Sequence, residues 1–132
     1  CFYRDASKAL CLTQTDLRNF QLAKGALRAG LEVLQERTGF EDARISKVLI
    51  SGAFGKALPV EALKKVAILP ADMVDKTFFV PNGVLAGLTR YLAMSEGEER
   101  LTELMALITP FPLSGTPAFE EKFLAALDFT SK

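Results

Sequence analysis

The chain has 132 residues, with 16 Lys and Arg balanced by 16 Asp and Glu, and it contains no histidine. This length fits one domain with a buried core, which we place at residues 1–132. Because no run of Lys and Arg exceeds two residues, neither a nucleic-acid surface nor an anionic-membrane surface is expected. Without histidine, a Ser-His-Asp or Cys-His catalytic arrangement is excluded within this chain.

The two cysteines, Cys1 and Cys11, are too few for a zinc or iron–sulfur site, so no metal site is expected in this chain. Nothing else in the sequence is typical of a secreted protein, and we expect both thiols to be reduced. The longest uncharged run, 104–119, contains three prolines and is too short and too irregular to span a bilayer. The chain begins with Cys rather than Met, and we expect it to be a piece of a longer cytoplasmic protein.

The strongest pattern predicts a long helix over residues 14–38. Thr13 and Asp16 have the spacing of a capping box, and Gly39 is a suitable residue to end the helix. Apolar side chains recur at steps of three and four, which is the period of one helical face, and comprise Leu17, Phe20, Ala23, Leu27, Leu31 and Leu34.

The middle of this helix combines small residues with basic ones. Glycines inside a helix cost about 1 kcal/mol each, so Gly25 and Gly30 predict that a neighbouring element or a ligand presses closely against that face. Lys24 and Arg28 are four residues apart and therefore share a face. They are candidates to contact a ligand, and an ordinary solvated basic face is the alternative.

Strands and helices alternate along the chain. Two short strands, 2–4 and 9–12, are predicted around a polar turn ahead of the long helix. The later segments are strands 48–50 and 77–80, helices 59–67, 84–94, one ending near 108 and 117–127, and an extended stretch at 109–113. Repetition of strand, helix and strand predicts a parallel pair joined by a right-handed crossover. The fold class is therefore α/β, with a mixed sheet flanked by helices that is truncated on its N-terminal side.

Glycine-containing turns follow both of the predicted parallel strands. Ser51 through Gly55 follow the first strand, and Pro81, Asn82 and Gly83 follow the second. Ligands of open α/β sheets bind beyond the carboxyl ends of the strands, where glycine lets the backbone approach a ribose or a phosphate. The helix that begins after Asn82 would also favour an anion at its N-terminus. Purely structural turns are the alternative for both segments.

Four segments in this order resemble a known family: LTQTDLR at 12–18, QLAKGALRAG at 21–30, SGAFG at 51–55 and NGVLAG at 82–87. The family is the carboxy-terminal region of the ATP-dependent reductive activators of corrinoid proteins. These belong to the superfamily of acetate and sugar kinases, heat-shock chaperones and actin (ASKHA). The resemblance covers nearly the whole chain. It departs from the family pattern at Pro81 and Ala67, where glycine is usual, and at 56–58.

The resemblance implies a complete protein with an N-terminal plant-type [2Fe–2S] domain, a linker region and a two-lobed ATPase domain. This chain would be most of the second, ribonuclease-H-like lobe, with ATP and Mg²⁺ bound between the lobes. The complete protein would use ATP to drive electron transfer to a corrinoid protein, its expected partner, and a homodimer is left open. The phosphate-binding loops and the metal-linked acidic residues would lie in the other lobe, so no catalytic residue is expected here and the isolated chain should be inactive.

By the same resemblance, the turn that supports the adenosine is formed by Gly52, Ala53, Phe54 and Gly55. Lys24 and Arg28 would flank the base or the phosphates, and Asn82 and Gly83 would lie at the neighbouring turn. The alternative to this function is a docking or dimerisation module that keeps the fold and binds no nucleotide.

Overall fold

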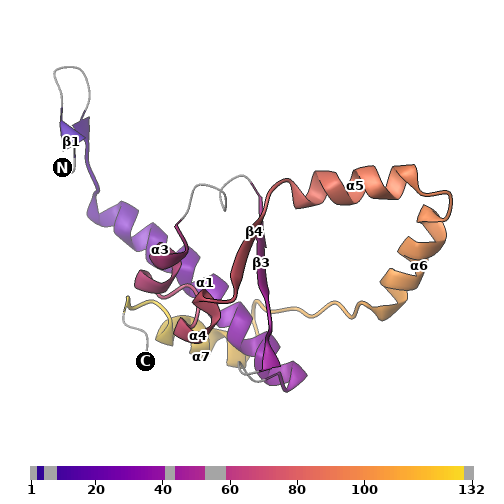
Figure 1. The fold of residues 1–132 in the computed structure, drawn as a ribbon. Helices are drawn as coiled ribbons and strands as arrows, with labels where there is room; N and C mark the ends of the chain where they lie inside the picture. Colours follow the sequence, from indigo (N-terminus) through magenta and orange to yellow (C-terminus); the bar gives the residue numbers. More distant parts are fainter. Residues whose placement is uncertain (1–2, 5–8, 41–43, 53–58, 130–132) are drawn as a thin grey trace.

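The computed structural model describes residues 3–4, 9–40, 44–52 and 59–129 (Figure 1). The α/β class is confirmed, with a small parallel sheet flanked by helices. The strands are β1 Tyr3–Arg4, β2 Ala9–Leu10, β3 Val48–Ser51 and β4 Thr77–Val80. The helices are α1 Gln14–Thr38, α3 Val60–Lys65, α4 Ala71–Val74, α5 Gly83–Ala93, α6 Gly97–Leu107 and α7 Pro117–Ala125.

The strands of the described residues form two separate pairs. β3 and β4 are parallel, as predicted, with Val48 opposite Thr77 and Ser51 opposite Val80. β1 and β2 form an antiparallel pair of two residues each, which lies beyond the N-terminal end of α1 and does not join β3 and β4 (Figure 1). The described strands thus form two small sheets and not the single mixed sheet that the sequence predicts. The long helix α1 separates the two strand pairs.

Helix α1 begins and ends where the sequence predicts. The side-chain oxygen of Thr13 accepts from the backbone N–H of Asp16 at 3.1 Å, and the carboxylate of Asp16 accepts from the N–H of Thr13 at 2.9 Å. Both bonds satisfy donors that a helix N-terminus leaves unpaired. At the other end Gly39 adopts φ +66°, and its N–H donates to the carbonyl of Glu36.

The apolar face predicted on α1 is not the face that this chain buries. Leu27 is 64% exposed, and the side chains of Phe20 and Leu34 are exposed as well. The buried positions are those of the small-residue face, namely Lys24, Gly25, Ala29, Gly30 and Val33. Small side chains let another helix approach closely, which outweighs the greater hydrophobicity of the leucine face within this chain.

Helix α7 packs on this small-residue face (Figure 1). A Cβ atom on Gly25 would lie 3.2 Å from Leu127 and 3.4 Å from Phe123, and one on Gly30 would lie 3.3 Å from Leu113. These distances are tighter than ordinary van der Waals contact. The close neighbour predicted from the glycines is thus a helix of the same chain.

A second small cluster lies between α3 and α4. The sequence does not predict helix α4, because its four residues are too few to show a helical periodicity. Leu63, Met73 and Val74 are buried there, together with Ala67. Ala67 has φ +57°, in the left-handed region that glycine adopts most easily.

Helices α5 and α6 extend away from the other helices (Figure 1). They contact each other, and Gly97 is the one buried residue in the two helices. Leu92 and Leu107 are 80% and 82% exposed. The apolar spacing predicts both helices, but no other element among the described residues covers their apolar sides.

Replacing Thr13 by Ala should lower the free energy of unfolding by about 1 kcal/mol, because the capping box loses one of its partners. Hydrogen bonds from the side chain and then the backbone of Thr13 lower the pKa of Asp16 below its usual value. The stabilisation of the fold by these hydrogen bonds is therefore present above the unfolded-state pKa of Asp16, and it is lost as the pH falls through the lower folded-state pKa of Asp16. Chemical denaturation as a function of pH should show this dependence in the wild type and a weaker one in Thr13→Ala.

The matched control is Thr15→Ala in the same exposed first turn, which should change the free energy of unfolding by less than about 0.5 kcal/mol. Equal effects of the two substitutions would contradict the role assigned to Thr13.

Candidate functional site

The carboxyl ends of β3 and β4 lie at one edge of the parallel pair, and three of the predicted site residues lie there. Gly52 follows β3 with φ +110°, a conformation that side chains rarely adopt. Asn82 and Gly83 follow β4, where Asn82 has φ +52° and Gly83 begins α5. The structure thus brings Gly52, Asn82 and Gly83 to the same edge. Ala53, Phe54 and Gly55 lie outside the described residues.

A hydrogen bond joins the end of β3 to the start of α5. The backbone N–H of Gly83 donates to the Oγ of Ser51 at 3.0 Å. Asn82 makes no side-chain cap on α5, so Ser51 satisfies a donor that the helix N-terminus would otherwise leave unpaired. Ser51 lies inside the SGAFG segment, but local sequence patterns do not predict its role, because its partner is 32 residues away.

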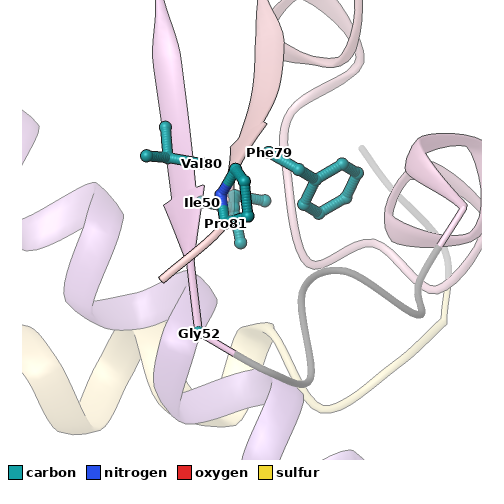
Figure 2. A pocket seen from close by; sticks show the side chains of 5 residues that line it. All are labelled: Ile50, Gly52, Phe79, Val80 and Pro81. Atoms are coloured by element: carbon teal, nitrogen blue, oxygen red, sulfur yellow. The ribbon is translucent and has the colours of Figure 1, made fainter. Parts of the chain in front are cut away.

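A hollow of about 230 Å³ lies beside these turns, lined by Ile50, Gly52, Phe79, Val80 and Pro81. Figure 2 shows the ring of Phe79 on one side of Pro81, with Gly52 just beyond the end of β3. Small-molecule pockets usually measure at least about 300 Å³. Apart from Gly52 and its chain neighbours, no described atom lies within 4 Å of the position that a Cβ on Gly52 would take. The lining is mainly apolar.

Lys24 is buried, with 1% of its surface exposed, so the alternative of a solvated basic face is wrong for this residue. Its Nζ donates to the backbone carbonyl of Asp128, and the ring of Phe129 lies 5.0 Å away. Burial lowers the pKa of Lys24, the nearby charge of Asp128 acts against this, and Arg28 adds to the lowering. The ammonium group thus holds the chain just beyond the C-terminal end of α7, whose last residue is Ala125.

Two neighbours of Lys24 on α1 hold the same end of α7. The Nε2 of Gln21 donates to the carbonyl of Leu127 at 3.2 Å. The rings of Phe20 and Phe129 stack with their centres 6.1 Å apart. We call Phe20, Gln21 and Lys24, with the 127–129 segment that they contact, the α7 clamp.

Arg28 is less fully engaged than Lys24. Its Nε forms an ion pair with Glu32, one turn further along α1, at 2.5 Å. Its Nη1 is buried and has no hydrogen-bond partner among the described residues.

The described residues also bear on membranes and metals. Among them there is no helix with the length and apolar character needed to cross a membrane. They likewise contain no group of three or more Cys, Asp or Glu side chains that could hold a metal ion.

A parallel strand pair flanked by helices, with glycine turns at its carboxyl edge, fits a truncated actin-like fold. A sequence model of the family described as "C-terminal domain of RACo the ASKHA domain" matches residues 3–132, and the chain belongs to this family. The chain is also 28% identical over 117 residues to "Corrinoid activation enzyme RamQ" of Eubacterium limosum. That match covers 89% of this chain and 20% of RamQ, so the chain spans about a fifth of that relative's length. The resemblance inferred from the sequence is confirmed.

Replacing Lys24 by Ala should lower the free energy of unfolding by about 1–3 kcal/mol, because it removes a buried hydrogen bond and the packing of a long side chain. Lys24→Met, which keeps the apolar stem, should recover part of this loss. The measurement is chemical denaturation, and Lys64→Ala on the exposed side of α3 is the control, with an expected change of less than about 0.5 kcal/mol. A loss in Lys24→Ala as small as in the control would contradict the α7 clamp.

Proposed function

We propose that this chain forms one wall of an ATP site in a protein that couples ATP to the reductive reactivation of a corrinoid protein. The observation that carries the proposal is the pair of glycine turns at one edge of the β3–β4 pair, joined by the Ser51–Gly83 bond and flanked by an open apolar hollow. Membership of the ASKHA family and the name of the RamQ relative support the nucleotide and the corrinoid partner respectively.

In this proposal Gly52, with Ala53, Phe54 and Gly55, supports the adenosine. Glycine at position 52 fits this role, because a backbone without a side chain lets a ligand approach closely. Asn82 and Gly83 contribute the neighbouring turn and the N-terminus of α5.

Lys24 and Arg28 complete the proposed set of nucleotide contacts, with unequal support. The unpartnered, buried Nη1 of Arg28 fits a role as donor to the nucleotide. The amino group of Lys24 already serves the α7 clamp, so its proposed contribution to the nucleotide has the weaker structural support. If Lys24 does contact the nucleotide, the loss of affinity in Lys24→Ala should shrink as the salt concentration rises.

The remaining parts of the proposed mechanism would lie outside this chain. A [2Fe–2S] domain would supply the electron, and the other lobe would supply the phosphate loops and the carboxylates that hold Mg²⁺. ATP binding and hydrolysis would drive closure of the lobes and with it an unfavourable electron transfer to a cob(II)alamin-type cofactor of the partner. We place this reaction in the cytoplasm.

The second candidate function, a docking or dimerisation module without nucleotide, is favoured by one observation. Helices α5 and α6 carry large exposed apolar side chains. They surround a hollow of about 580 Å³ whose lining includes Tyr91, Leu101 and Leu104. Exposed apolar patches of this kind mark contact surfaces. The nucleotide affinity of the full-length protein separates the two functions.

Replacing Gly52 by Val in the full-length protein should weaken ATP binding by roughly tenfold or more, because a branched side chain occupies space that the nucleotide needs. The φ of +110° adds a strain of about 1–3 kcal/mol to the variant, so its folding must be measured in parallel with calorimetric titration of ATP.

Gly39→Val provides the control for backbone strain, since Gly39 also has positive φ and lies at the end of α1 with open space around it. It should lose stability and keep its ATP affinity. A folded Gly52→Val protein with unchanged affinity would remove Gly52 from the site.

Residues 1–132 alone should show no ATPase activity above background, because a site formed between two lobes needs both of them. The measurement is phosphate release from ATP by the purified piece. Turnover well above background that Gly52→Val abolishes would contradict this expectation.

A further inference from the structure

We propose that Ser51 is a positioning residue: its hydroxyl fixes the start of α5 against the end of β3, and so sets the affinity for the nucleotide. The proposal rests on the proposed ATP site. Its structural basis is the 3.0 Å bond from the N–H of Gly83 to the Oγ of Ser51, which links the last residue of β3 to the first residue of α5.

The bond supplies what the start of α5 lacks. The first N–H groups of a helix have no partner within it and are usually capped by the side chain of the preceding residue. That residue, Asn82, is held in the left-handed conformation and makes no side-chain cap. Ser51 therefore caps an 11-residue helix from the neighbouring strand.

The fit between positions 51 and 83 is also steric. A Cβ atom on Gly83 would lie 2.5 Å from the Oγ of Ser51 and 3.2 Å from its Cβ. Gly83 is not among the glycines with positive φ, so its backbone conformation does not require glycine. Glycine is required at position 83 because the Ser51 hydroxyl occupies the space that a side chain would need. The two residues form a matched pair, in which the serine needs the glycine and the helix start needs the serine.

The pair affects binding because a ligand that contacts both turns must find them in the correct relative position. Val80 lies opposite Ser51, so the strand pairing ends at these two residues, and residues 81–83 lie beyond it. Beyond this point the Ser51–Gly83 bond fixes the arrangement before the ligand arrives, which lowers the cost of ordering on binding. A net contribution typical of one hydrogen bond corresponds to a change in affinity of about three- to tenfold.

The test uses the full-length protein and calorimetric titration with a non-hydrolysable ATP analogue. Ser51→Ala should bind the analogue about three- to tenfold more weakly, and Ser51→Thr, which keeps the hydroxyl, should bind within about twofold of the wild type. Ser46→Ala, an exposed serine just before the other end of β3, is the matched control and should bind as the wild type does. Amide hydrogen exchange at Gly83 should be faster in Ser51→Ala than in the wild type, with exchange at Ala86 unchanged.

A double-mutant cycle tests the matched pair. Gly83→Ala alone should weaken binding at least as much as Ser51→Ala. In the Ser51→Ala background, the same change at position 83 should cost less, because the clash with the hydroxyl is gone.

Wild-type affinity in a folded Ser51→Ala protein, or additive effects in the cycle, would overturn the role of Ser51 and leave the ATP site standing. A wild-type protein that binds no ATP would overturn the proposed function, and the positioning role with it.

Discussion

The edge where the turns meet depends on the register of β3 against β4. Because Ser51 lies opposite Val80, both strands end at the same level of the sheet, and the residues that follow them lie near each other. A shift by one residue would turn every side chain of the shifted strand to the opposite face. The Ser51 hydroxyl would then miss the N–H of Gly83, and the hollow lined by Ile50 and Phe79 would lose its walls. Four residue pairs of parallel sheet thus determine the geometry of the candidate site.

Local patterns were sufficient to predict much of the fold. The capping box at Thr13, the left-handed Gly39 and the bounds of α1 follow from interactions within a few residues of chain, and the structure has all three. The parallel pair follows from the alternation of apolar strands with helices. The site residues Gly52, Asn82 and Gly83 could be placed at one edge because parallel strands end together. Their contact with a nucleotide is a prediction that the fold by itself does not test.

The features that could not be predicted depend on residues far apart in the chain. Nothing in the helical spacing of Lys24 indicates that its ammonium group meets the carbonyl of Asp128, 104 residues later. Hydrophobicity also favours the leucine side of α1 as the buried one. The structure buries the glycine side because close helix packing depends on shape, and the complementary shape belongs to α7.

The packing of α7 against Gly25 has a consequence for how this family can diversify. A larger residue at position 25 would press on the Leu127 side chain at 3.2 Å and on Phe123 at 3.4 Å. A smaller residue at position 127 would make room for a larger one at position 25, whereas the reverse order passes through an overpacked intermediate. The two positions should accept substitutions in a preferred historical order. The residues tolerated at position 25 would then depend on the residue at position 127, which measurements on single variants would not reveal.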